Sequence, residues 1–250
     1  MFVRIVVTLL LVGCLTACDS EEGRYTAEGY SEVTPINQAE AIEGNGAVLG
    51  QVRFVGTPPV MKEIPNRPCH SGAGTITEET ALVGVDGGLK NVLVYIEGGP
   101  VVDGSGAEPA LLDQVDCRYV PHVLGVQADQ PLVVRSSDPT LHNVHYNPKR
   151  NAPANFGMTK AGQEKTVTFK AHEFIQVRCD VHPWMSAFIG VFENPFFAVT
   201  DENGQFQIEH LPDGQYTLAT WHERYGRLER EIEVVDGAVV EAGFEYRPPG

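Results

Sequence analysis

Two short segments contain the residues with the clearest chemistry. In the segment 178–185, Cys179, His182 and Met185 have the spacing C-x2-H-x2-M, and His142 lies thirty-seven residues upstream of Cys179. A thiolate and two imidazoles with a weak axial thioether form the donor set of blue-copper sites. One short loop between adjacent strands can aim the three late residues at one point. His142 must then arrive from a neighbouring strand, as it can in a β-sandwich.

Three other interpretations of these residues remain open. Cys179 can instead form a disulfide with Cys69 or Cys117. A zinc ion can use one thiolate and two imidazoles, although zinc gains nothing from a thioether. Met185 taken alone is more often a core residue than a ligand, and only its position after His182 favours the copper site.

The remaining histidines carry weaker signals. His145 lies on the same predicted strand as His142, three residues on, and is therefore expected on the opposite face. His122 and His222 are either structural or part of a second metal site. No Ser-His-Asp order, phosphate-binding loop or pair of catalytic carboxylates stands out in the rest of the chain.

The rest of the chain consists of short runs of β-branched residues separated by turn residues, and these runs are the elements that position the candidate ligands. The chain has 26 Gly and 17 Pro in 250 residues, and no amphipathic helical pattern follows the first eighteen residues. Strands at this spacing predict an all-β sandwich or barrel. The expected strands include 48–55, 91–97, 132–135, 165–169, 174–178 and 187–192.

A second unit is predicted from about residue 194. Turn signals at 201–204 and 211–214 are each followed by an alternating run, which indicates a small antiparallel module. Residues 195–246 resemble the carboxypeptidase regulatory-like or transthyretin-like sandwich, a resemblance carried by Thr200, Gly204, Phe206, Leu211, Pro212, Gly214 and Tyr216. Those motifs are structural and name no chemistry.

The segments His142-Asn-Val-His-Tyr146 and Cys179-Asp-Val-His-Pro-Trp-Met185 resemble the copper loops of the cupredoxins. The resemblance implies a Greek-key β-sandwich over 47–193, a type 1 copper ion and electron transfer. It also implies a role for each residue of the two loops: copper ligands His142, Cys179, His182 and Met185; Asn143 bracing the thiolate; and a surface patch of Pro183 and Trp184 through which electrons pass. Cys69 and Cys117 are then expected to form a disulfide.

The N-terminus has the layout of a bacterial export signal. A basic start, a short apolar run and the sequence Leu15-Thr16-Ala17-Cys18 resemble a lipoprotein box. We expect residues 1–17 to be removed, Cys18 to be lipidated and 18–46 to form an acidic tether. The protein is then anchored to a bacterial membrane and faces the periplasm, and Asp19 suggests retention at the inner membrane. Ordinary secretion is the alternative.

The formal charge of -15 excludes nucleic acid as a partner, because no basic patch could dominate that field. A closed four-ligand site favours an electron carrier over an enzyme. The acidic surface predicts a basic redox partner, such as a cytochrome or an oxidoreductase. The alternatives are a copper-delivery protein and a metal-free structural or interaction sandwich; an enzyme would need a further copper site built from His122, His145 or His222.

Overall fold

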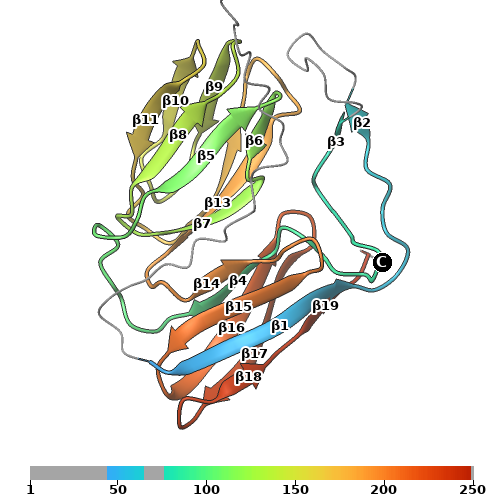
Figure 1. Cartoon of the computed structure of the whole chain (residues 1–250), viewed down its shortest axis with the longest axis vertical. Coiled ribbons are helices and arrows are strands. Elements are labelled where there is room, and N and C mark those ends of the chain that lie inside the picture. Colours follow the sequence, from blue (N-terminus) through green and yellow to red (C-terminus); the bar gives the residue numbers. More distant parts are fainter. Residues whose placement is uncertain (1–43, 65–75, 249–250) are drawn as a thin grey trace, which may run out of the picture. The chain divides into compact units, whose positions relative to one another are not determined.

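The computed structural model describes residues 44–64 and 76–248. These contain nineteen β-strands and no helix (Figure 1). The prediction of an all-β sandwich protein is confirmed. Cys14, Cys18, Asp19 and Cys69 lie outside the described residues, as do the predicted signal peptide and most of the tether. In the part of the chain that is described, no helix is long and apolar enough to span a membrane.

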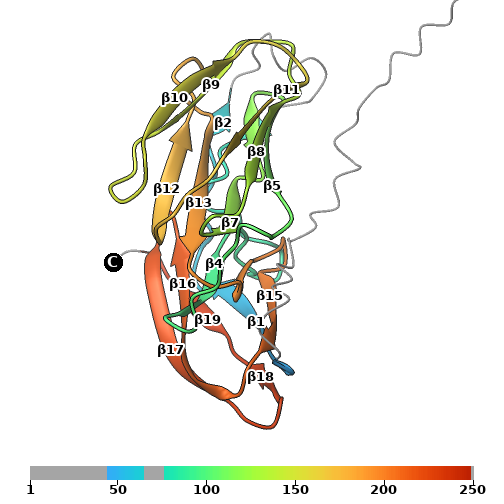
Figure 2. The same cartoon turned by 90° about the vertical axis from the view of Figure 1, so that its left-hand side faces the viewer.

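Two sheets form what we call the first sandwich (Figures 1 and 2). One sheet has the order β10-β9-β12-β13-β7 and the other β11-β8-β5-β6. Their strands are β5 (Ala110–Val115), β6 (Arg118–Val120), β7 (Val123–Gln127), β8 (Leu132–Ser136), β9 (His142–Tyr146), β10 (Ala154–Met158), β11 (Gln163–Val167), β12 (Glu173–Arg178) and β13 (Ser186–Phe192).

The two sheets of the first sandwich share one hydrophobic core. Leu112 and Val134 come from one sheet, while Val144, Val177 and Ile189 come from the other, and all five are buried in the same cluster. In β8 buried and half-buried residues alternate, because successive side chains of a strand point to opposite faces. Cys179 and Met185 also belong to this core. The two ends of the loop 179–185, which we call the metal loop, are therefore anchored in the first sandwich.

The second sandwich consists of the sheets β15-β1-β18, with β19 also paired to β1, and β14-β4-β16-β17. Its strands are β1 (Gly46–Phe54), β4 (Leu93–Glu97), β14 (Phe197–Val199), β15 (Gln205–Leu211), β16 (Gly214–His222), β17 (Gly226–Val234), β18 (Val239–Glu241) and β19 (Phe244–Tyr246). The short strands β2 (Glu63–Ile64) and β3 (Ile76–Thr77) pair with each other outside both sandwiches.

The sheets do not follow the predicted boundary between residues 193 and 194. β1 pairs with β15, with Val48 opposite Ile208, and β4 pairs with β16, with Leu218 opposite Ile96. Two strands that precede the first sandwich in the sequence thus complete the second one. Local patterning predicted β1 and β4 as strands, but the choice of partner depends on tertiary packing, because either sandwich could bury the same apolar face.

Candidate metal centre

The loop 179–185 connects β12 to β13, where Arg178 pairs with Ser186. The N–H of Cys179 donates to the carbonyl of Met185 at 3.1 Å, and the N–H of Met185 donates to the carbonyl of His182 at 2.9 Å. These two bonds close a tight turn between neighbouring strands. The C-x2-H-x2-M spacing is therefore the length of one hairpin connection.

His142 reaches this loop from the next strand. It is the first residue of β9, which pairs with β12 where His145 lies opposite Arg178. The Nδ1 atoms of His142 and His182 are 3.0 Å apart, and the Sγ atom of Cys179 is 3.7 Å from Nδ1 of His182. The structure thus brings together three of the four predicted ligands, and Met185 is buried in the same core as Cys179.

These separations fit a shared metal ion. Metal–nitrogen bonds of about 2.0 Å and metal–sulfur bonds of about 2.3 Å place such donors about 3 to 4 Å apart around one ion. The side chain of His142 is fully buried, Cys179 is 2% exposed and Met185 is 1% exposed. Two imidazoles, a thiolate and a thioether in a largely buried cluster match the donor chemistry of copper.

Asp138 fixes the orientation of the His142 ring. Its Oδ2 atom lies 2.8 Å from Nε2 of His142, which leaves Nδ1 to face His182. The carboxylate also accepts the backbone N–H groups of Asp116 and Cys117 at 2.8 and 2.9 Å. Carboxylates of this kind set the tautomer of ligating histidines. The sequence interpretation missed Asp138; the available signal was an acidic residue four positions before the histidine.

The electrostatics of the site favour a thiolate at Cys179 beside an imidazolium at His142. Burial opposes the charge on His142, but hydrogen bonds to Asp138 and Cys179 outweigh it and raise the pKa of His142 to about 9. Burial also opposes the thiolate, yet the hydrogen bond with His142 and backbone N–H groups, including that of Asn143, lower the pKa of Cys179. The thiolate is the form that binds a metal.

Asn143 ties the ligand loop to β9. Its Oδ1 atom accepts the backbone N–H of Asp180 at 2.7 Å, directly after Cys179. Its Nδ2 group donates to Asn155 at 2.8 Å and to the carboxylate of Asp180 at 3.0 Å. These contacts hold the loop against β9 and β10, and the bracing of a copper-bound thiolate by Asn143 stays a prediction.

A second sulfur lies next to the two imidazoles. The Sγ atom of Cys117 and the ligand nitrogens of His142 and His182 all lie within 4.8 Å of one another. Cys179 is a free, buried cysteine. The predicted disulfide between Cys117 and Cys69 stays a prediction, because Cys69 lies outside the described residues. Both Cys117 and Cys179 therefore lie close enough to the two imidazoles to be considered as a metal ligand.

Pro183 and Trp184, the residues of the predicted surface patch, directly follow His182 in the loop. Trp184 is half-buried, and its indole N–H donates to the carbonyl of Cys117 at 3.1 Å. Pro183 is exposed, and so is Val181, at 48%. Leu141, next to His142 in sequence, is 46% exposed.

The other candidate histidines have structural partners. Both rings of the pair His122 and His222 are buried; His122 contacts Glu223, and Nδ1 of His222 accepts the N–H of Arg224. His145 lies 2.9 Å from Asp180 at the surface. Within the described ranges, the cluster at His142 and His182 is the one place where three such donor residues meet.

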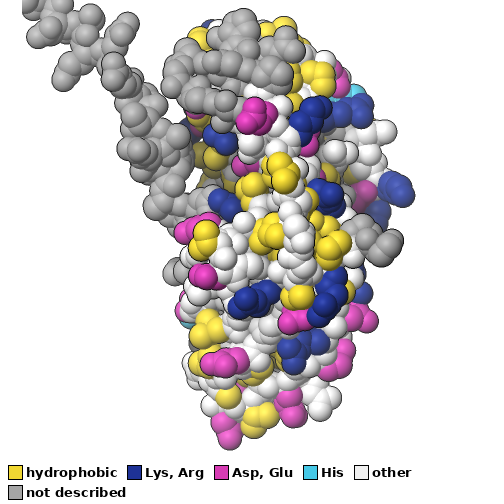
Figure 3. Space-filling model, turned by 90° about the vertical axis from the view of Figure 1, so that its right-hand side faces the viewer, with side chains coloured by type: hydrophobic (Ala, Val, Ile, Leu, Met, Phe, Trp, Pro, Cys, Tyr) yellow, Lys and Arg dark blue, Asp and Glu magenta, His cyan; other side chains and the backbone are white. Residues whose placement is uncertain are grey.

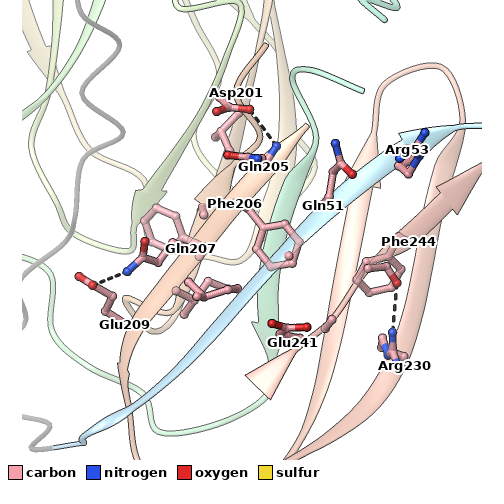
Figure 4. Close-up of a pocket in the computed structure, with 18 of the residues that line it drawn as sticks. Gln51, Arg53, Asp201, Gln205, Phe206, Gln207, Glu209, Arg230, Glu241 and Phe244 are labelled. Atoms are coloured by element: carbon pink, nitrogen blue, oxygen red, sulfur yellow. Dashed lines mark hydrogen bonds between the residues drawn. The ribbon is translucent and has the colours of Figure 1, made fainter. Parts of the chain in front are cut away.

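A large open groove of about 1290 Å³ lies on the second sandwich and contains none of the predicted ligands (Figure 4). Amide, carboxylate and guanidinium groups line it without concentrating one charge, among them Gln51, Arg53 and Glu241. Gln205 donates its N–H to Asp201, and Gln207 donates its side-chain amide to Glu209. Among the described residues, no group of three possible metal ligands lies in this groove.

No family model and no curated protein matches this chain. Among solved structures, the chain is similar to a copper-containing nitrite reductase from Thermus scotoductus SA-01, with 22% identity and a TM-score of 0.30, covering 38% of this chain and 26% of that one. The chain thus spans about a quarter of that reductase.

Two smaller proteins are similar over most of their own length. A reduced mutant form of amicyanin shares 20% identity with a TM-score of 0.31, covering 39% of this chain and 97% of the amicyanin. The purple cupredoxin from Nitrosopumilus maritimus shares 16% identity with a TM-score of 0.28, covering 33% of this chain and 98% of that one.

Proposed function

We propose that this protein is a membrane-tethered type 1 copper protein that carries electrons outside the cytoplasm. The observation that supports it most is the convergence of His142, Cys179 and His182 above a buried Met185. Copper, when bound, supplies a metal that gains and loses one electron. The protein residues provide the donor set and a rigid β-scaffold, which keep the surroundings unchanged as the charge changes.

The burial of the ligands favours a carrier over a delivery protein. His142 is inaccessible to solvent and is fixed by Asp138, while Cys179 is fixed by the Asn143 contacts. A protein that hands its metal to another needs ligands that a partner can reach. Here only His182 among the three converging ligands is partly exposed, which suits electron exchange through its ring edge.

The partner is proposed to be a redox protein that docks on the exposed apolar side chains around His182. Residues 110–192, which hold the first sandwich, contain eight Lys and Arg against seven Asp and Glu, whereas the whole chain has 18 against 33. The acidic excess thus lies outside the first sandwich, and on the face in Figure 3 both signs are interspersed. We propose that apolar contact provides docking and that the acidic remainder steers a basic partner.

The decisive experiment is an absorption spectrum of the copper-loaded protein. We expect an intense charge-transfer band in the red region that is lost in Cys179→Ala. A colourless 1:1 copper complex would indicate delivery instead, and absence of copper binding would indicate a metal-free role. The association rate with a basic cytochrome should fall as ionic strength rises; a rate independent of salt would refute the steering.

A further inference from the structure

A buried ion pair connects the second sandwich to the strand after the metal loop. His122, just before β7, and Glu223, just after β16, are in contact through Nε2 and Oε1, and their side chains are 5% and 10% exposed. Nδ1 of His122 lies 3.0 Å from the carbonyl oxygen of Ser186. Ser186 comes directly after Met185.

The partners of His122 define what its ring does. A carbonyl oxygen and a carboxylate are both acceptors, so both ring nitrogens donate, and the ring is an imidazolium balanced by Glu223. The backbone carbonyl of His122 also accepts the N–H of Phe188 at 2.8 Å. His122 therefore holds the start of β13 at two points, Ser186 and Phe188.

The end of β16, directly before Glu223, packs against the first sandwich. Trp221, two residues before Glu223, stacks on Phe174 of β12 with ring centres 4.7 Å apart and planes 7° from parallel, and its ring lies 5.3 Å from that of Phe188. Gly125 and Gly190 face each other on β7 and β13. A Cβ atom at Gly125 would lie 2.5 Å from Phe197, and one at Gly190 would lie 2.7 Å from Leu93. The second sandwich therefore packs closely on the strands that border the metal loop.

We propose that Glu223 is a positioning residue for the metal loop: through His122 it fixes the Ser186 carbonyl, and thereby the position of Met185. This rests on the proposed function only in so far as Met185 is a copper ligand; the anchoring of the loop exists without metal. The second sandwich would then hold in place the part of the loop that contains Met185.

The test uses the full chain and the variant Glu223→Ala, with Glu223→Gln as the conservative variant and Glu233→Gln, an exposed glutamate of β17, as the control. In the metal-free protein, Glu223→Ala should speed hydrogen exchange of the Met185 and Phe188 amides at least about tenfold, because a buried partner is lost. Amides of β8 should be unchanged. Glu223→Gln, which keeps a hydrogen bond, should show a smaller effect, and it serves alone if the alanine variant does not fold.

In the copper-loaded protein, Glu223→Ala should change the intensity ratio of the visible bands and the reduction potential, while Glu233→Gln should not. Exchange that accelerates uniformly in both sandwiches, or not at all at Met185 and Phe188, would overturn the proposal. A wild-type protein that gains no red-region band with copper, but shows the selective exchange, would support the anchoring while refuting the copper function. If the copper-loaded wild-type protein is blue, but Glu223→Ala changes neither the visible bands nor the hydrogen exchange of Met185 and Phe188, the anchoring is refuted and the copper function is not.

Discussion

Nε2 of His142 and the carboxylate of Asp138 lie 2.8 Å apart in a buried part of the first sandwich, and this contact decides which nitrogen of His142 faces the metal loop. The carboxylate accepts a hydrogen bond from the Nε2–H group, so Nδ1 is the ring nitrogen that faces His182. The pair is thus a part of the candidate metal centre that lies beyond its four ligands.

The first prediction concerns Asp138. Asp138→Asn should lower copper affinity about 10- to 100-fold, because an amide no longer enforces the tautomer or the basicity of His142. A competition titration with a chelator of known affinity measures the effect. Asp129→Asn, a surface change in the same sandwich, is the control; equal affinities for the two variants would contradict the role of Asp138.

A second prediction separates the two cysteines near the imidazoles. Cys179→Ser should abolish the red-region band, because an alkoxide or hydroxyl cannot replace the thiolate as donor. The double variant Cys69→Ser/Cys117→Ser should retain it, since the disulfide is expected to lie outside the coordination sphere. Absorption spectra of the copper-loaded variants provide the measurement. If the band survives in Cys179→Ser and disappears in the double variant, Cys117 is the ligand.

Met185 offers a way to distinguish a ligand from a core residue. Met185→Leu conserves volume and should cost less than about 1.5 kcal/mol of unfolding free energy in the metal-free protein, whereas Met185→Ala should cost about 2 to 5 kcal/mol. Denaturant unfolding gives both values. In the copper-loaded protein, Met185→Leu should change the spectrum and the reduction potential; a spectrum unchanged by it would mean that Met185 is core filler.

The fourth prediction is a pH dependence that originates in the second sandwich. Burial, with smaller contributions from the charges of His122 and Arg224, lowers the pKa of His222 to about 4. In the unfolded chain the pKa of a histidine is about 6.5. Between these values the unfolded chain binds more protons, so the metal-free protein should lose about 3 kcal/mol of stability as pH falls from 6.5 to 4.

His222→Phe should remove this loss of stability at acid pH. Unfolding curves measured between pH 4 and 7 would then show a smaller dependence of the unfolding free energy on pH. His122 does not mask the effect, because Glu223 raises the pKa of His122 despite its burial. The contribution of His122 to the unfolding free energy is fully present below pH 6.5 and is lost as the pH rises through the folded-state pKa of His122. A wild-type slope identical to that of His222→Phe would contradict the buried neutral state of His222.

The candidate site shows which part of a metal centre can be predicted from sequence. Cys179, His182 and Met185 lie in one loop of seven residues, so their spacing alone limits them to a common location, and His142 was expected on an adjacent strand. Asp138 and Cys117 were not recognised as neighbours of His142. Their positions depend on the turns between β5, β6, β8 and β9, where the carboxylate of Asp138 accepts two backbone N–H groups.

The sequence by itself determined an all-β chain, several of its strands and turns, and a copper-type donor set, because alternation and short-range spacing are properties of contiguous residues. Only the tertiary structure decided that β1 and β4 complete the second sandwich, that Asp138 orients His142, and that Glu223 reaches His122 across 101 positions of sequence. The physical reason is that strand pairing and buried polar contacts depend on the packing of whole sheets. Many strand registers satisfy the local pattern, but few of them give every buried polar group a hydrogen-bond partner.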